Sequence, residues 1–389
     1  MSNDNIKNVL NIENKKYKKL QEFENGMNDN DSKISSAQAE EVYQLLPKLP
    51  DKKGTLLISL TVPHLRTRLV EYLQNRMLEH SILESSIKIE VDLLENFVLD
   101  IIDSCLLFNE IEMEAINILF LEAGEKLDFN TFGKTQSLLK LYRLVKGKDL
   151  IYILNNKTLK TYFQPIIDIK KNEIYAYECL SRGIREDGSL MGSHLIFRTA
   201  SKNDLLFYLD REARECALTT ALANKITKKI FINFVPTAIY NPETCLKDTL
   251  EWTKRLGHDP SNIVFEIIET ENIVDTKHLK TFLDTYRKLG FEIALDDIGS
   301  GYSSLSLLAD IRPDYIKVDM EIIRDIDKQP FKQTIFKALA YIAGQNNIKL
   351  LAEGVETKEE LDYCISQNVD YVQGFYFSKP TVIPLETIK

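Results

Sequence analysis

Apolar residues follow two different spacings along the chain, and the change between them falls near residue 155. Before it, Leu65, Leu69, Leu73 and Met77 recur at every fourth position, which is typical of the buried face of a helix. Residues 54–155 are therefore predicted to form a mostly α-helical domain, whose apolar stripes serve as core or as dimer interface. Two further sets in this region have helical spacing: Val91, Leu94, Val98, Ile101 and Cys105, and Leu138, Leu141 and Val145.

After residue 155, short runs rich in β-branched and aromatic residues alternate with helical patterns over 204–225, 277–289 and 333–346. This alternation predicts an α/β fold, a TIM-like (β/α)8 barrel over residues 156–389. Only KKNE separates the first two runs; because this is too short for a crossover helix, those two strands should form an antiparallel hairpin. The eight runs are YFQPIID, IYAYECL, IFINFV, IVFEIIE, EIALDD, YIKVD, IKLLAEG and YVQGFYF.

Composition and charge limit the partners. Residues 1–53 are rich in Asn, Asp, Lys, Glu and Ser, which predicts a mobile tail. The net charge of −9 over 389 residues opposes a nucleic-acid polymer or an anionic membrane as main partner. No apolar stretch approaches the roughly 20 residues that span a bilayer, and the first residues lack the apolar core of a signal peptide. We therefore expect a cytoplasmic protein.

Cysteine and histidine offer no recognisable site. The five cysteines and five histidines are scattered, without the CxxC or HExxH spacing of common zinc sites. No histidine stands near a candidate nucleophile motif, which argues against a serine or cysteine triad. Carboxylates and amides must therefore carry any chemistry.

Polar side chains stand in the predicted strands or directly after them, where a TIM-type barrel places its active site. So many acids in one cleft are strongly unfavourable without cations. Asp, Glu and Asn oxygens suit Mg²⁺ or Mn²⁺ rather than zinc or copper. The pattern predicts a magnesium or manganese site at the rim of the barrel. The residues are Glu178, Asn233, Glu266, Glu269, Asp296, Asp297, Lys317, Glu353 and Gln373.

The stretch IALDDIGSGYSSL places Asp296 and Asp297 side by side. Taken alone, the pair is better interpreted as a solvated strand end, followed by a helix that Ser303 or Ser304 caps. The acids on the other strands favour metal ligation instead. Adjacent carboxylates can hold two ions roughly 3.5 to 4 Å apart, the separation used in two-metal hydrolysis of phosphate esters.

These residues also carry a resemblance to a known family. Glu178, Cys179 and Leu180, extended by Arg182, are followed in order by FINFVP, FEIIET, LDDIGSGYSSL, DYIKVD, LAEGVET and QGFYFSKP. Over roughly residues 158–389 the chain resembles an EAL domain, the family of cyclic di-GMP phosphodiesterases. The resemblance implies a barrel with one antiparallel strand.

The resemblance also implies metal ligands. Glu178, Asn233, Glu266 and Asp296 resemble the ligands of a first ion, and Asp296 with Asp297 would reach a second. The expected cofactor is thus a pair of Mg²⁺ or Mn²⁺ ions.

Further roles follow from the same resemblance. Lys317 would hold the attacking water and stabilise charge on the phosphate, and Glu353 would assist proton transfer. Gln373 and Arg182 resemble contacts to the substrate or to water. Glu269 resembles the residue that anchors the glycine–serine loop over 299–304, where family dimers meet.

The chain departs from the family at a few positions. Cys179 replaces an alanine, which should be harmless, whereas Ile268, Ile298 and Ser300 replace other residues near the loop and weaken its expected anchoring. The segment GSHLIFRTA lacks the proline and the acidic residue common after the name motif. Asp210, in LFYLD, is then the candidate for contact with a base edge.

One nearby pattern has a structural interpretation. In TKEE, Thr357 and Glu360 form a capping box, which predicts a helix start directly after EGVE. Glu356 is interpreted as structural for the same reason, and Asp319 is compatible with either a structural or a functional role.

The leading hypothesis is a metal-dependent phosphodiesterase that opens cyclic di-GMP to linear pGpG. We expect a homodimer, or a protein partner bound through the helical domain, to regulate it. One alternative is a catalytically weak or inactive receptor that binds cyclic di-GMP and passes the signal to the helical domain. The other is a barrel enzyme for a different phosphodiester.

Overall fold

The computed structural model describes residues 46–47, 53–84, 86–236, 249–250, 253, 257, 259–267, 276–299 and 305–388. Apart from residues 46, 47 and 53, the tail expected over residues 1–53 lies outside the described residues.

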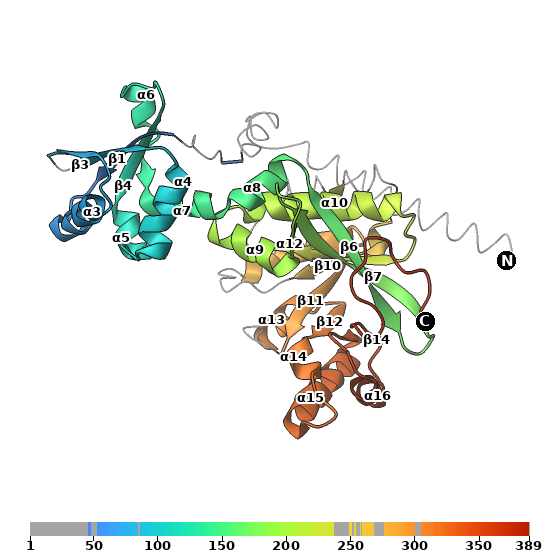
Figure 1. Ribbon diagram of the computed structural model, residues 1–389. Coiled ribbons are helices and arrows are strands. Elements are labelled where there is room, and N and C mark those ends of the chain that lie inside the picture. The colour runs from blue at the N-terminus through green and yellow to red at the C-terminus, as the bar shows by residue number, and fades with distance from the viewer. Residues whose placement is uncertain are drawn as a thin grey trace.

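The first unit is a five-stranded sheet with order β2-β3-β1-β4-β5, antiparallel at each pairing (Figure 1). A β-α-β-β-α-β chain order with β1 between β3 and β4 is the ferredoxin-like arrangement. The elements are β1 (Gly54–Ser59), α3 (Pro63–Asn75), β2 (His80–Leu83), β3 (Ser86–Val91), α4 (Leu94–Leu99), the π-helix η1 (Asp100–Ser104), α5 (Glu110–Ala115), β4 (Asn117–Glu122), α6 (Phe129–Phe132), β5 (Gln136–Ser137) and α7 (Leu138–Lys146).

This sheet corrects the expectation of a mostly α-helical domain over 54–155. The stretches GTLLIS and SIKIEV alternate buried and partly exposed positions along most of their length, which is the period of a strand. Val91 therefore ends β3, and the helix begins at Leu94. Met77 lies beyond α3 and is 93% exposed. The helical spacing of Leu138, Leu141 and Val145 is confirmed in α7.

The second unit is a closed barrel. Its sheet has the order β6-β14-β13-β12-β11-β10-β9-β7-β8, and β6 also pairs with β7, which closes the ring. Strand β6 runs antiparallel to both β7 and β14, whereas the other ring neighbours are parallel. The expected TIM-like barrel with one antiparallel strand is confirmed, and each of the predicted runs overlaps one ring strand.

The barrel strands are short, and most of their connections contain a helix. Helix α8 (Lys148–Asn155) leads from the first unit into the barrel. The strands are β6 (Leu159–Asp168), β7 (Glu173–Ile184), β8 (Leu190–Met191), β9 (Lys229–Phe234), β10 (Ile263–Ile267), β11 (Glu292–Ile298), β12 (Tyr315–Val318), β13 (Lys349–Ala352) and β14 (Tyr371–Val372). The helices are α9 (Ser193–Lys202), α10 (Leu206–Ala223), η3 (Pro260–Asn262), α12 (Thr276–Lys288), α13 (Leu305–Ile311), α14 (Met320–Ile323), α15 (Pro330–Asn346) and α16 (Lys358–Ser366).

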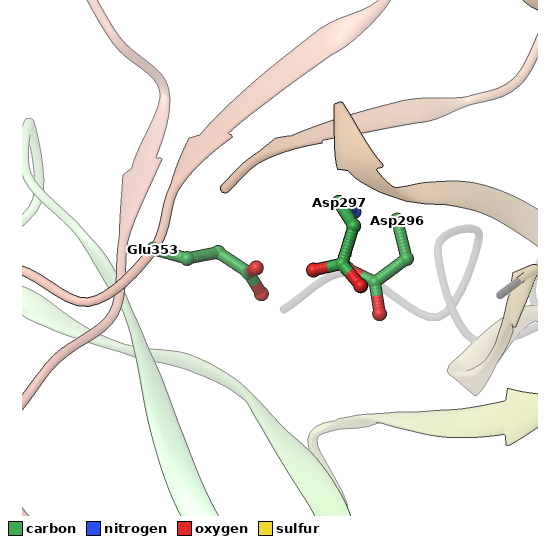
Figure 2. A group of neighbouring side chains, drawn as sticks. All are labelled: Asp296, Asp297 and Glu353. Carbon is green, nitrogen blue, oxygen red and sulfur yellow. The ribbon is translucent and has the colours of Figure 1, made fainter. Parts of the chain in front are cut away.

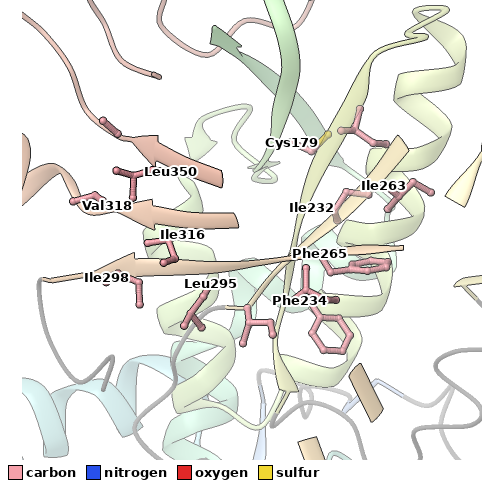
Figure 3. Packing of buried hydrophobic residues seen from close by; sticks show 14 of the residues in the cluster. Cys179, Ile232, Phe234, Ile263, Phe265, Leu295, Ile298, Ile316, Val318 and Leu350 are labelled. Atoms are coloured by element: carbon pink, nitrogen blue, oxygen red, sulfur yellow. The ribbon is translucent and has the colours of Figure 1, made fainter. Parts of the chain in front are cut away.

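Alternate strand residues build two cores. The larger core contains Ile232, Phe265, Leu295 and Ile316 and packs the strands against the helices (Figure 3). The smaller core fills the barrel interior. Because neighbouring side chains on a strand point to opposite faces, each strand serves both cores. The smaller core takes one residue from each ring strand: Ile166, Ala176, Phe231, Val264, Ala294, Tyr315, Leu351 and Tyr371.

Helix α7 takes part in the cores of both units. Leu138, Leu141 and Val145 pack in the core under the first sheet. Leu144 belongs instead to a cluster formed with α8, α9 and α10. A salt bridge of 3.8 Å joins Arg143 to Asp204, the latter at the end of α9. Helix α7 thus connects the two units through apolar packing as well as through the chain.

No helix among the described residues is both long enough and apolar enough to cross a membrane.

Candidate active site

One position on each ring strand faces the barrel mouth above the small interior core. In a strand, the residue two positions along shares the face. For each parallel strand, a polar residue lies two positions after the residue of the small interior core. On the antiparallel strand β6, the polar residue lies two positions before the interior residue. These residues form what we call the mouth layer: Gln164, Glu178, Asn233, Glu266, Asp296, Lys317, Glu353 and Gln373.

Lys317 lies at the centre of the acids in this layer. Its Nζ is 2.6 Å from Glu266, 2.7 Å from Glu353 and 2.8 Å from Asp296. Glu178 is 3.7 Å away. The Lys317 side chain is only 1% exposed, and a charge this deeply buried is tolerated only when it is paired. Acids from four strands therefore surround the ammonium group of Lys317.

Burial and mutual repulsion set the protonation of these groups. Burial raises the pKa of Glu266 and of Glu353 well above the usual value, although the nearby Lys317 opposes the rise. Burial alone would lower the pKa of Lys317, but Asp296, Glu266 and Glu353 outweigh it and raise the pKa. Lys317 is therefore charged at neutral pH. The surrounding acids repel one another, and further positive charge in the site would stabilise their ionised forms.

Asp296 and Asp297 both reach the mouth because the strand is irregular there. The register between β11 and β12 shifts between Leu295 and Ile298, which is the position of the two aspartates. An irregularity of this kind redirects side chains, so neighbours that would face opposite sides of a regular strand lie on one side. Asp297 has a φ of 53°, and its backbone N–H donates to Asp296 Oδ1 at 3.0 Å.

The two aspartates lie opposite Glu353, and the three side chains form a small acidic cluster (Figure 2). One oxygen from each lies within 4.8 Å of the others. The Asp297 side chain is exposed at the mouth, yet desolvation of the carboxyl, followed by the charge of Asp296, raises the pKa of Asp297 to about 7. The distances between the three carboxylates, within 4.8 Å of one another, suit groups that share a cation.

The donor set fits divalent cations. The Glu266 side chain is fully buried, and its Oε1 lies 2.6 Å from Lys317 Nζ, whereas its Oε2 has no hydrogen-bond partner among the described residues. A buried carboxylate oxygen without a hydrogen bond needs positive charge nearby. Lys317 supplies one charge among four acids. Oxygen ligands of this kind are those that Mg²⁺ and Mn²⁺ prefer.

Gln164 is a site residue that the sequence analysis missed. Its Nε2 donates to the Ser378 carbonyl at 3.1 Å, so its Oε1 accepts from Gln373 Nε2, also at 3.1 Å. Gln373 Nε2 also donates to Glu178 at 2.5 Å. The hairpin register pairs Gln164 with Glu178. The predicted hairpin could have identified Gln164, because in its register Gln164 of YFQP lies directly opposite Glu178.

Asn233 is the mouth-layer residue of β9 and is half-buried. The remaining expected site residues lie outside this layer or outside the described residues. Arg182 lies on β7, with its guanidinium 5.6 Å from the ring centroid of Tyr162. Glu269 lies outside the described residues, as do Ile268 and the loop residues 300–304 with the proposed caps Ser303 and Ser304. These expectations stay predictions.

Asp210 has protein partners at both of its oxygens. Its Oδ1 accepts the Val235 backbone N–H at 3.0 Å, and its Oδ2 pairs with Arg214 at 2.9 Å. The side chain is buried in α10. A base contact by Asp210 stays a prediction, and such a contact would compete with these partners.

Two structural interpretations of nearby residues are supported. Thr357 and Glu360 form the expected capping box of α16. Asp319 caps α14, because its Oδ1 accepts the Glu321 backbone N–H at 2.6 Å. A cap accounts for Asp319 without requiring a role in chemistry.

The fold and the mouth layer define a class: an α/β barrel with one antiparallel strand and a lysine-centred acidic site suited to divalent cations. The model of the EAL domain matches residues 148–380. The chain therefore belongs to the EAL-domain family.

Similar proteins support this assignment over the barrel. PdeG of Escherichia coli, named a probable cyclic di-GMP phosphodiesterase, is 31% identical over 231 residues, or 58% of this chain and 45% of that protein. The blue light- and temperature-regulated antirepressor BluF of the same organism is 27% identical over 218 residues, or 56% of this chain and 53% of that protein. The chain thus spans about half the length of these curated relatives.

A solved structure has the same barrel. The standalone EAL protein from Vibrio cholerae, in its c-di-GMP-bound form, is 37% identical and superposes with a TM-score of 0.54. The match covers 59% of this chain and 95% of that one. The barrel, rather than the first sheet, is the part in common.

Proposed function

We propose that this chain hydrolyses cyclic di-GMP to linear pGpG. The observation that carries the proposal is the mouth layer, in which Lys317 joins acids from four strands and the acidic cluster lies beside them. The names of PdeG and of the Vibrio cholerae complex support the choice of nucleotide.

Carboxylates of the barrel mouth and the amide of Asn233 would bind the metal ions that the reaction needs. Two Mg²⁺ or Mn²⁺ ions, held by Glu178, Asn233, Glu266, Asp296 and Asp297, would neutralise phosphate charge and make water a better nucleophile. Water adds to phosphorus, one P–O ester bond breaks, and the leaving oxygen takes a proton.

The remaining polar groups position the reactants and move protons. Lys317 directs its ammonium toward charge that develops on the phosphate. Burial raises the pKa of Glu353, which makes its carboxylate suited to take the proton of the attacking water. Gln373 and Arg182 would bind the nucleotide or its water network, and Gln164 orients the amide of Gln373.

A turnover assay tests the proposal. The full chain is incubated with cyclic di-GMP and either Mg²⁺ or Mn²⁺, and the products are separated by chromatography. We expect pGpG, and no product after chelation of the metal. Linear dinucleotides and simple phosphodiesters serve as competing substrates, and faster cleavage of either would assign a different substrate.

A receptor is the second candidate, because BluF, a relative over the same barrel, is named an antirepressor rather than a phosphodiesterase. Calorimetry distinguishes the two functions. Tight binding of cyclic di-GMP without any cleavage in the presence of either ion would establish the receptor and contradict the enzyme.

We also propose that the first unit regulates the barrel, through a homodimer or a bound protein partner. The apolar packing of α7 against both units supports a mechanical connection. Sedimentation of the full chain, with and without cyclic di-GMP, measures the oligomeric state. A monomer under both conditions would leave the partner protein as the regulator.

A further inference from the structure

The short helix α14 lies between the two turns that carry the acidic cluster. Gly299 follows Asp297 by two residues, and a Cβ on it would lie 2.8 Å from Cγ1 of Ile322. Gly354 follows Glu353, and a Cβ on it would lie 2.3 Å from Cβ of Met320. Both glycines have positive φ. The backbone of each turn therefore packs directly against a residue of α14.

The far end of α14 is fixed by the carboxylate of Glu360. Its Oε1 accepts the backbone N–H of Asp325 at 3.0 Å. Its Oε2 accepts the backbone N–H groups of Glu356 at 2.9 Å and of Thr357 at 3.1 Å. The Glu360 side chain is 2% exposed. One buried carboxylate thus joins the segment after α14 to the segment after β13, which begins with Glu353.

A capping box alone does not require this arrangement. The box needs the contacts between Glu360 and the helix start at Thr357, whereas the bond to Asp325 reaches a segment 35 residues away. Arg324 adds a second link between the same segments, at 2.7 Å from Glu356 and 3.6 Å from Glu360. The extra contacts hold α14 against the turn of Glu353.

We propose that Glu360 is a positioning residue that, through α14, fixes the separation between Asp297 and Glu353. The inference rests on the proposed function, because the separation matters through the divalent ions that these acids would share. Groups that orient metal ligands from behind typically change metal affinity 10- to 100-fold when they are removed.

The test is Glu360→Gln in the full chain. The glutamine oxygen can still accept from the helix start, but its amide group cannot accept from Asp325 N–H, so the cap survives and the link is lost. Titration calorimetry with Mn²⁺, in the absence of nucleotide, should show binding weakened roughly tenfold. In turnover, the Mn²⁺ concentration for half-maximal rate should rise similarly, with the KM for cyclic di-GMP within about twofold of wild type.

Glu359→Gln is the matched control, because Glu359 is the exposed neighbour on the same turn; we expect wild-type Mn²⁺ binding from it. Equal Mn²⁺ binding by the two variants would overturn the positioning role. Absence of Mn²⁺ binding by the wild type would instead overturn the proposed function. If Glu360→Gln does not fold, Arg324→Met, at a partly exposed residue, decides the question: weaker Mn²⁺ binding supports the link, and unchanged binding overturns it.

Discussion

Lys317 is the residue on which the charge balance of the mouth layer depends. Its ammonium contacts acids from β7, β10, β11 and the end of β13. Under the proposed function, this group would act mainly when negative charge develops on the phosphate, rather than in holding the substrate. Loss of its charge should therefore affect rate more than binding.

Lys317→Ala should lower the turnover of cyclic di-GMP by at least roughly 100-fold, as removal of a charge-stabilising donor does. Nucleotide binding should stay within a few fold of wild type. Rate measurements with excess Mn²⁺ and calorimetry with cyclic di-GMP check both parts. Wild-type turnover in this variant would remove Lys317 from the mechanism, and lost binding would make it a substrate-binding residue instead.

The adjacent aspartates should differ from each other in metal stoichiometry. If Asp296 serves both ions and Asp297 only one, Asp297→Asn should keep one Mn²⁺ site and still bind nucleotide. Asp296→Asn should weaken both sites, and both variants should be nearly inactive, because catalysis by an ion pair needs both ions. Calorimetry with Mn²⁺ measures the stoichiometry.

Near-normal turnover and equal Mn²⁺ stoichiometry in the two aspartate variants would give the opposite conclusion. The pair would then be a solvated strand end, the simpler interpretation of IALDD taken alone. The shift in register at Leu295 and Ile298 favours the functional interpretation, because it directs both carboxylates toward Glu353.

At the scale of elements, the first turn of α16 carries the carboxylate of Glu360, whose ionisation should affect the free energy of unfolding. Burial alone would raise the pKa of Glu360, but backbone N–H groups of Glu356, Asp325 and Thr357 and the charge of Arg324 together lower it. A carboxyl whose folded-state pKa is lowered contributes stability above its unfolded pKa, near 4.3, and loses that contribution as pH falls further.

The difference in unfolding free energy between wild type and Glu360→Gln should therefore be largest near neutral pH and should shrink below about pH 4.3. Urea unfolding at several pH values, with chelator present, measures this difference. We expect a difference of about 1.5 to 3 kcal/mol at neutral pH, the usual contribution of hydrogen bonds to a charged group. A difference independent of pH would mean that the charge of Glu360 is not what holds the two segments.

The sequence predicts the barrel elements well and the first sheet poorly, for a physical reason. Each barrel run is rich in β-branched and aromatic residues, and seven of the eight contain a polar residue that was identified as a site candidate, so the runs support one interpretation together. In the first unit, only Asp92 and Leu93 separate SIKIEV from LENFVL. Val91 then falls by chance on the helical spacing of Leu94 and Val98, and the strand was missed.

The site shows the same limits. The polar residues in or directly after the parallel strands were identified as candidates, because the carboxyl ends of barrel strands mark the barrel mouth. Gln164 was missed because β6 runs antiparallel, so its mouth residue comes before the interior residue Ile166 rather than after it. The role of α14 depends on contacts of Gly299 and Gly354 with Ile322 and Met320. Contacts between residues far apart in the sequence have no local signal.

At the scale of the whole molecule, α7 is the element through which we propose that the first unit acts on the barrel. Helix α8, which follows it, packs closely on β7: a Cβ on Gly183 would lie 2.4 Å from Cδ1 of Ile153. Asp149 of α8 also pairs with Arg185 at 2.9 Å. Because β7 carries Glu178 and Arg182, movement of α7 and α8 has a direct route to the mouth layer.

Substitutions of two leucines on α7 should have separate effects, one on the stability of the first unit and the other on its packing against the barrel. Leu141 packs in the core of the first sheet and Leu144 in the cluster with α8 to α10. Either change to Ala should cost about 2 to 5 kcal/mol locally. Hydrogen exchange of the full chain should then show faster exchange in β1 and β4 for Leu141→Ala, but in α8 and α9 for Leu144→Ala, since amide protection reports local stability.

The same pair tests regulation. If the packing of Leu144 transmits the state of the first unit, Leu144→Ala should change turnover more than Leu141→Ala does, although Leu141 is the more deeply buried of the two. Equal turnover in both variants, together with the expected separate patterns of hydrogen exchange, would show that this contact only attaches the units. Regulation would then have to reach the barrel by another surface, and α7 would be a structural connection alone.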